Sequence, residues 1–133
     1  MSQANSNNSQ FKAWLAALVG WLIPGAGHLS LGYVVRGLSL GLTVWVMFFI
    51  GVACGGHLHN ILERSAGVLS NVFGLCDLGV GLLFWVARGI GYAVTEQSRL
   101  PTAEYGNIFL MVAGLMNYLL ALDAFDLGVG RKS

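Results

Sequence analysis

Residues 37–55, GLSLGLTVWVMFFIGVACG, decide the fold class because they form a long apolar run without one charged side chain. The uncharged stretch extends to Leu62, and about 20 apolar residues are enough for an α-helix to cross a bilayer. Three more runs are similar: residues 13–35 and 105–122 carry no charge, and residues 65–87 carry only Asp77. The sequence therefore predicts an all-α integral membrane protein with about four transmembrane helices.

The overall composition favours lipid as the solvent and argues against nucleic acid as a partner. Hydrophobic residues make up 56% of the 133-residue chain and charged residues only 10%, whereas a soluble domain carries about 25% charged residues. A formal net charge of +1 leaves no basic surface to hold a phosphate backbone. Both cysteines, Cys54 and Cys76, lie in apolar runs, so we expect free thiols.

The chain divides into three parts by composition. Residues 1–10 are polar and without apolar periodicity, which predicts a disordered tail. Residues 11–130 form a single helical membrane domain, and residues 131–133 form a basic C-terminal end. Within the domain, Pro24 is expected to end the first helix near Ile23, because proline lacks a main-chain donor and clashes with the preceding turn. Residues 24–32 are then a glycine/proline turn, either a bent connection or a shallow re-entrant segment.

Glycines recur along one face of the second predicted helix. Gly37, Gly41, Gly51 and Gly55, which we call the glycine seam, are spaced by steps of three and four around Val44 and Phe48. Membrane helices associate through close backbone approach over small residues, so this seam is predicted to contact another helix. The alternative is that glycine is simply frequent in membrane helices.

Four polar side chains lie within or at the ends of the predicted spans: Asp77, Asn117, Asp123 and Asp126. An ionisable group at membrane depth is costly unless it has a partner, and Asn117 lies at a depth that would suit Asp77. The alternative is that Asp77 lies nearer the membrane interface, where it has a structural role as a hydrogen-bonded group. Asp123 and Asp126, three residues apart, suggest either a cation site or an interfacial charge cluster that ends the helix, and we favour the cluster.

The sequence contains no motif typical of an enzyme, and we predict no catalytic residues, no metal and no cofactor. Zinc ligation by His28, His57 or His59 would need further donors that the sequence does not place nearby. A membrane enzyme that uses His28 with Asp123 or Asp126 meets a geometric objection. If the first helix reaches Gly27, the histidine and the aspartates lie at opposite faces of the bilayer, about 30 Å apart.

Two blocks of sequence resemble a known group of proteins. The first block is PGAGH at residues 24–28 with LG at 31–32 and RG at 36–37, and the second runs from EYGN at 104–107 to LDAFD at 122–126 and GRK at 130–132. Together they resemble small uncharacterised bacterial membrane proteins, which are similar to the two-transmembrane-helix domain family. Leu29 and Ser30 depart from the bulky aromatic of that wider family. The resemblance implies a membrane location and a structured turn made by Pro24, Gly25, Gly27, His28, Gly32 and Arg36.

We expect a non-enzymatic inner-membrane protein that acts as a scaffold, accessory or assembly subunit through glycine-lined packing, as a homo-oligomer or within a larger membrane complex. The alternative is a small oligomeric channel or carrier that uses Asp77 and Asn117. Four spans place both termini on one side, and the positive-inside rule tilts that side towards the cytoplasm of a bacterial cell. The count sets Lys12, Arg64, Arg131 and Lys132 on the terminal side against Arg36, Arg88 and Arg99 on the other.

Overall fold

The computed structural model describes residues 2–56, 67–90 and 101–130, and these ranges are helical without any β-strand. The helices are α1 (Ser2–Leu22), α2 (Ala26–Ser30), α3 (Val34–Ala53), α4 (Gly67–Leu78), α5 (Leu82–Gly89) and α6 (Ala103–Val129). The all-α prediction is confirmed. Among the described residues only α3 and α6 are long and apolar enough to cross a membrane, so the structure does not support four transmembrane helices.

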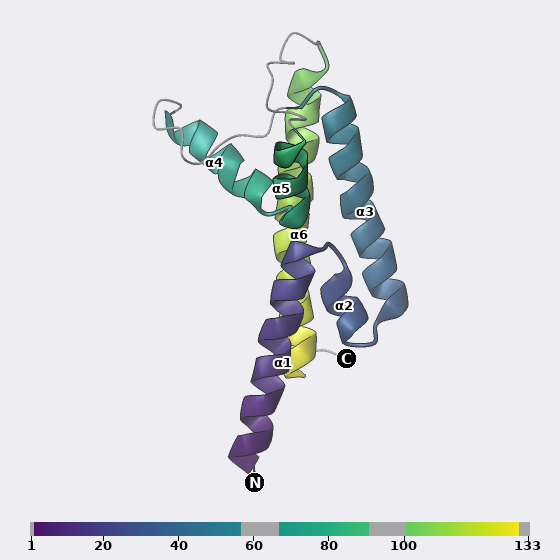
Figure 1. The fold of residues 1–133 in the computed structure, drawn as a ribbon, viewed down its shortest axis with the longest axis vertical. Coiled ribbons are helices and arrows are strands. Elements are labelled where there is room, and N and C mark those ends of the chain that lie inside the picture. Colours follow the sequence, from purple (N-terminus) through teal and green to yellow (C-terminus); the bar gives the residue numbers. More distant parts are fainter. Residues whose placement is uncertain (1, 57–66, 91–100, 131–133) are drawn as a thin grey trace.

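The longest helix, α6, is the axis of the fold (Figure 1). It contacts α1, α2, α3 and α4, and α3 runs antiparallel to it on one side (Figure 1). The helix ends at Val129 and is followed by Gly130, whose φ of 84° is the left-handed conformation that commonly terminates helices. The buried residues of α6 include small ones such as Gly106, Ala113 and Gly114, which let neighbouring backbones come close.

The first helix differs from the prediction at its start. It begins at Ser2, so residues 2–10, expected to be a disordered tail, are helical. The Ser9 hydroxyl donates to the Gly128 carbonyl, with 3.3 Å between the oxygens, and Ala13 lies against Gly128. The far end matches the proline argument, because α1 stops at Leu22 and the chain then turns at Pro24.

After Leu22 the chain reverses direction. Gly25, with φ 87°, precedes the short helix α2, and Gly32, with φ 89°, lies between α2 and α3. Figure 1 shows α1 rising beside α6 to about half its height, α2 returning, and α3 rising again. Residues 24–32 are therefore a folded connection built around a helix of five residues.

The third apolar run, expected to be one helix, is split in two. Helix α4 ends at Leu78, and α5 begins at Leu82 after Gly81, which has φ 68°. A residue with a side chain at Gly79 would meet the Tyr118 ring at 2.5 Å and the Gly114 carbonyl oxygen at 2.6 Å. The close approach to α6 at this point explains why small residues occupy the break, and the break explains why this run contributes no full-length span.

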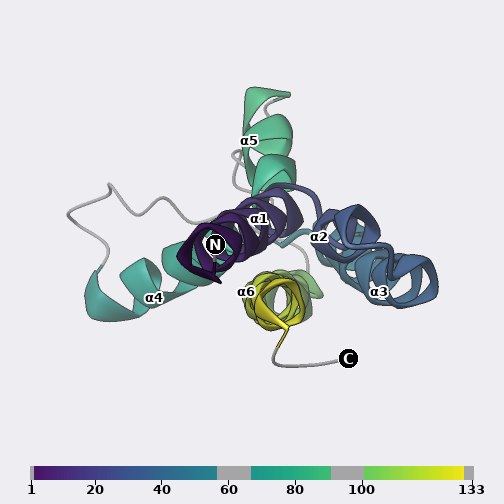
Figure 2. The same ribbon diagram turned by 90° about the horizontal axis from the view of Figure 1, so that it is seen from below.

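The two interrupted segments meet near the middle of α6. A side chain at Gly81 would overlap the Trp21 carbonyl oxygen and come within 3.0 Å of Leu22. In Figure 1, α1 and α2 approach this point from one end of α6, whereas α4 and α5 approach it from the other. Figure 2, seen along α6, shows the other helices on three sides of α6, with α3 beyond α2 and the remaining side of α6 left open.

Buried apolar side chains form a small core, and most of the apolar surface lies outside it. The core joins α3, α5 and α6 through Val44, Phe48, Phe84 and Leu110 with their neighbours. Only 28% of the most apolar window of α3 and 33% of that of α6 are buried within the chain. The two cysteines are free thiols, as expected, with Cys76 buried and Cys54 partly buried.

Candidate functional site

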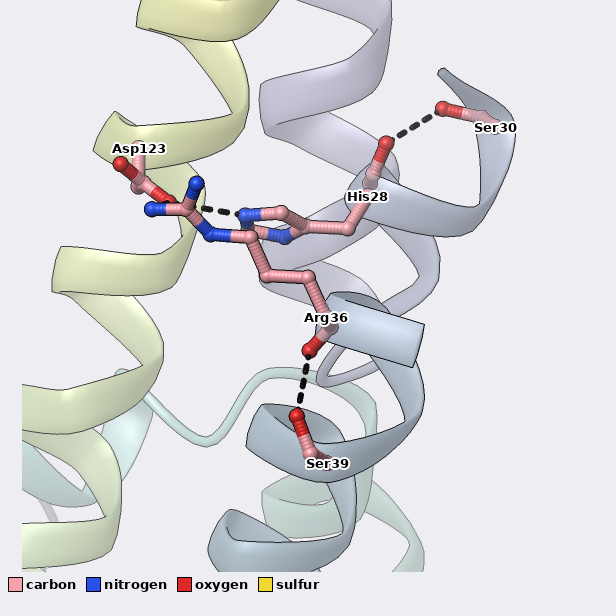
Figure 3. Close-up of polar contacts among 6 residues, drawn as sticks. His28, Ser30, Arg36, Ser39 and Asp123 are labelled. Carbon is pink, nitrogen blue, oxygen red and sulfur yellow. Dashed lines mark hydrogen bonds and ion pairs between the residues drawn. The ribbon is translucent and has the colours of Figure 1, made fainter. Parts of the chain in front are cut away.

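Three charged or titratable side chains from three helices meet at one carboxylate. His28 Nε2 and Arg36 Nη2 each lie 2.9 Å from Oδ2 of Asp123. Figure 3 shows the imidazole arriving from α2 and the guanidinium from the first turn of α3, with the aspartate on α6. The exposed fraction of the side chain is 1% for His28, 17% for Asp123 and 42% for Arg36. We call this group the polar cluster.

The local backbone explains why the polar cluster forms. A side chain at Gly27 would overlap the Ala16 carbonyl oxygen and lie 3.0 Å from the Ala124 methyl group, so α2 can approach α1 and α6 only with glycine there. The Ser30 hydroxyl donates to the Gly27 carbonyl at 2.7 Å (Figure 3). His28 is thereby carried on a helix held directly beside α6, with Asp123 next to Ala124 on the facing surface.

The polar cluster overturns the expected separation between His28 and Asp123. That estimate of about 30 Å assumed a first helix that continued straight to Gly27, and it is wrong. Because the chain reverses after Leu22, α2 returns along α6 and brings the imidazole into contact with the carboxylate. The same reversal places Arg36 at the end of the bundle where α6 ends, so the charge count that set Arg36 on the opposite side is also wrong. Arg64, Arg99, Arg131 and Lys132 lie outside the described residues.

The arrangement is suited to binding and orientation of charge. Asp123 accepts from two donors that can both carry positive charge, and such charge-assisted bonds are stronger than neutral ones. One turn further along α6, the partly buried Asp126 lines the same groove as Asp123. This α3–α6 groove has a volume of about 450 Å³, and its other walls are Leu40, Met116, Leu119, Leu120 and Leu122. The groove is apolar along most of its length and has two carboxylates at one end.

A second polar site lies at the meeting point of the interrupted helices. Asn117 is fully buried, and its Nδ2 donates to the main-chain carbonyls of Trp21 at 2.7 Å and Gly79 at 2.6 Å. Both amide hydrogens are thus used by main-chain oxygens, and Asn117 does not hydrogen-bond the Asp77 carboxylate. Within the described residues, Asn117 Oδ1 and Trp21 Nε1 are buried without a hydrogen-bond partner. Asp77, near the end of α4, is only 1% exposed.

The glycine seam lies against other segments of the same chain. A Cβ at Gly41 would lie 2.6 Å from the Pro24 carbonyl oxygen, and one at Gly37 would lie 2.8 Å from the Gly25 carbonyl oxygen. A Cβ at Gly51 would meet the Leu110 side chain at 2.8 Å. Gly55 follows the end of α3 with φ 84° and so closes the helix instead of extending the seam. The seam therefore packs α3 onto the turn after α1 and onto α6.

An apolar cleft of about 690 Å³ separates α3 from α5. Trp45, Phe49 and Val52 line it from α3, and Leu82 and Val86 line it from α5. Leu22 and Ile23, at the end of α1, also contribute to its walls. The residues that line the cleft are apolar, and the cleft is separate from the polar cluster and from Asn117.

Every member of the polar cluster was a candidate residue in the sequence, but their contact was not predicted. The two sequence blocks that resemble the uncharacterised membrane proteins could have indicated the contact, because His28 and Arg36 belong to the first block and Asp123 to the second. His57 and His59 lie outside the described residues. Across residues 2–56, 67–90 and 101–130, no group of three or more His, Cys, Asp or Glu side chains is placed to hold a metal ion.

Comparison with known proteins identifies a family without an assigned activity. The model of a family described as being of unknown function, DUF6677, matches residues 15–133. No curated protein matches the chain. No solved structure matches it either. The match includes every residue of the polar cluster and Asn117 and covers nearly the whole chain, so this protein belongs to the DUF6677 family.

Proposed function

We propose that this protein is a non-enzymatic scaffold or assembly subunit of the bacterial inner membrane, in which α3 and α6 cross the bilayer. The observation that carries the proposal is the apolar outer surface of these two helices. Leu42 on α3 is 65% exposed, and Leu119 and Leu122 on α6 are 65% and 63% exposed. A soluble protein rarely leaves contiguous apolar surface of this kind in water, whereas lipid covers it without cost.

In this arrangement each interrupted pair enters the bilayer to about half depth and turns back, and we call both pairs hairpins although α4 and α5 diverge from their turn (Figure 1). The α1–α2 pair enters from the side where α6 ends, and the α4–α5 pair enters from the other side (Figure 1). Irregular backbone at membrane depth needs a hydrogen-bond partner from the protein. Asn117 supplies one for both breaks by donating to Trp21 and Gly79, which supports the placement of the hairpin tips near the bilayer centre.

The same arrangement supports cytoplasmic termini. Lys12 and Arg36 belong to the end of the bundle where α1 begins and α6 ends, whereas Arg88, at the end of α5, belongs to the opposite end. Among the described residues the basic side chains thus favour the terminal side, which the positive-inside rule assigns to the cytoplasm. Fusion of a reporter that is active only in the cytoplasm to Ser133 tests this orientation.

The scaffold role rests on the apolar cleft, because the glycine seam is occupied within the chain. We assign the cleft to an apolar helix from a second copy of this protein, which would fill the space between α3 and α5. Phe49, at 57% exposed, and Val86, at 47% exposed, offer large side chains at its mouth. Packing between such surfaces gives association in lipid through van der Waals contact.

The test compares two tryptophan substitutions on exposed positions of α3. Ala53→Trp fills the cleft, and Leu38→Trp is a matched control on α3 at a position that does not line it. After mild detergent extraction and blue-native electrophoresis, we expect Ala53→Trp to reduce the oligomer about tenfold and Leu38→Trp to leave it unchanged. A strictly monomeric wild-type protein, or equal behaviour of the two variants, contradicts self-assembly through the cleft. Co-purification of a different membrane protein would indicate that the co-purified protein, and not a second copy, occupies the cleft.

A small oligomeric channel or carrier is the second candidate, favoured by the buried polar groups at the hairpin tips. Asp77 and Asn117 are both almost fully buried near the centre of the fold. Ion or proton flux in liposomes should then be lost in Asp77→Asn, while Glu104→Gln, at an exposed carboxylate on α6, should retain it. Absence of flux in the wild-type protein, or unchanged flux in Asp77→Asn, argues against transport.

A further inference from the structure

We propose that the α3–α6 groove binds one zwitterionic lipid whose headgroup carries a primary amine, as in phosphatidylethanolamine. The groove has an apolar part formed by Leu40, Met116 and Leu119 and a charged end formed by Asp123 and Asp126. This inference rests on the membrane placement proposed above, but it does not depend on the scaffold role. The inference assigns a ligand to the groove, which the proposed assembly does not use, and it explains why Asp123 and Asp126 lie at one end of that groove.

The length of the groove suits an acyl chain that begins at the charged end. Met116 precedes Asp123 by seven residues of one helix, which corresponds to two turns or about 10 Å. Leu40 follows Arg36 by one turn of α3, so both lie on the same face of that helix. A chain that lies between α3 and α6 therefore contacts leucine and methionine side chains and has its polar group beside Asp123, Asp126 and Arg36.

The charges at that end match an ammonium next to a phosphate. Two carboxylates line the groove, and Arg36, which contacts one of them, Asp123, at 2.9 Å, remains 42% exposed. A primary ammonium can donate up to three hydrogen bonds to carboxylate oxygens, and a guanidinium can hold a phosphate. A trimethylated choline headgroup lacks those donors. A phosphatidylglycerol headgroup offers the same phosphate to Arg36 but brings only neutral hydroxyls, and no positive charge, to the two carboxylates.

Native mass spectrometry of the full chain tests the proposal with three lipids that have the same acyl chains. The probes are phosphatidylethanolamine, phosphatidylcholine and phosphatidylglycerol, each titrated into protein in a mild detergent. We expect one bound phosphatidylethanolamine at an about tenfold lower concentration than either competitor. Asp126→Asn should abolish that preference, Asp126→Glu should keep it, and Glu104→Gln, the same chemical change at the opposite end of α6, should leave it intact.

A second pair of variants tests the apolar part of the groove. Leu119→Trp places an indole in the groove, whereas Leu115→Trp changes an exposed position of α6 that does not line it. We expect the first variant, and not the second, to lose the tightly retained lipid. Equal retention of the three lipids, or an undiminished preference in Asp126→Asn, overturns the inference even if the protein assembles in the membrane. Recovery of the chain in the soluble fraction would instead overturn the membrane placement itself.

Discussion

A matched pair of glycine substitutions separates backbone strain from crowding in the turn before α3. Gly25 and Gly32 have nearly the same φ, 87° and 89°, and flank the same short helix. Their surroundings differ, because a Cβ at Gly25 would overlap the main-chain carbonyl oxygen of Gly37, whereas a Cβ at Gly32 would have nothing within 4 Å. Gly25→Ala and Gly32→Ala therefore share the cost of a left-handed backbone conformation, and only Gly25→Ala adds a steric overlap.

The expected magnitudes follow from these surroundings. A left-handed conformation costs an alanine about 1–2 kcal/mol, and the smaller entropy of the unfolded alanine chain returns about 0.4–1 kcal/mol. Gly32→Ala should therefore lower the free energy of unfolding by about 0–1.6 kcal/mol. Gly25→Ala adds an overlap that only a shift of α3 can relieve, and overpacking of this kind costs about 1–3 kcal/mol more. We expect a total loss of about 1–5 kcal/mol for that variant, which is about 1–3 kcal/mol more than for Gly32→Ala.

Reversible unfolding in mixed micelles measures the difference. The purified chain in a mild nonionic detergent is titrated with sodium dodecyl sulfate, and helix content is followed by circular dichroism. Gly25→Ala should unfold at a clearly lower detergent fraction than Gly32→Ala, which should stay close to the wild-type protein. If the two variants lose the same stability within about 0.5 kcal/mol, the close approach of the turn to α3 is not present in the folded protein.

Four further substitutions can be measured by the same titration. Asp123→Ala should cost about 2–3 kcal/mol because it leaves the buried His28 without its carboxylate, and Arg36→Ala should cost less than about 1 kcal/mol because that side chain is partly exposed; the reverse order would contradict the cluster geometry. Asn117→Leu should cost about 1–3 kcal/mol by leaving two main-chain carbonyls without donors, and a neutral result would show that the hairpin tips do not depend on it. Gly89→Ala, in open space on α5, should stabilise by about 0.5 kcal/mol, and any large loss would show an unseen contact.

The helical class and the first break could be predicted because each depends on local chemistry. Long uncharged runs can satisfy their main-chain groups in lipid only as helices, and proline at position 24 cannot continue a helix. The resemblance of the sequence blocks to uncharacterised small proteins agrees with membership in a family of unknown function. The first two conclusions needed only neighbouring residues, and the third rests on two separate blocks of the sequence.

The second break and the polar cluster depend on contacts that local patterns do not contain. Gly79 and Gly81 look in sequence like many other glycines of the chain, and only their contacts with α6 and with Trp21 distinguish them. The pairing of His28 with Asp123 spans 95 residues of sequence. It follows from the reversal of direction after Leu22, which composition and periodicity do not reveal. An estimate of how far apart two residues lie across a membrane, made by assuming straight helices, fails where a helix ends before it has crossed the membrane.

The position of Asn117 on the final helix bears on how the protein is made. Ribosomes release the segments around Trp21 and Gly79 before α6 exists, so the main-chain oxygens that this amide satisfies must wait for the last quarter of the chain. In the membrane placement proposed above, a nascent protein without α6 would hold both hairpins in the translocation machinery or at the bilayer surface. Completion of synthesis, and not the insertion of each segment in turn, would then be the event that commits this protein to its native form.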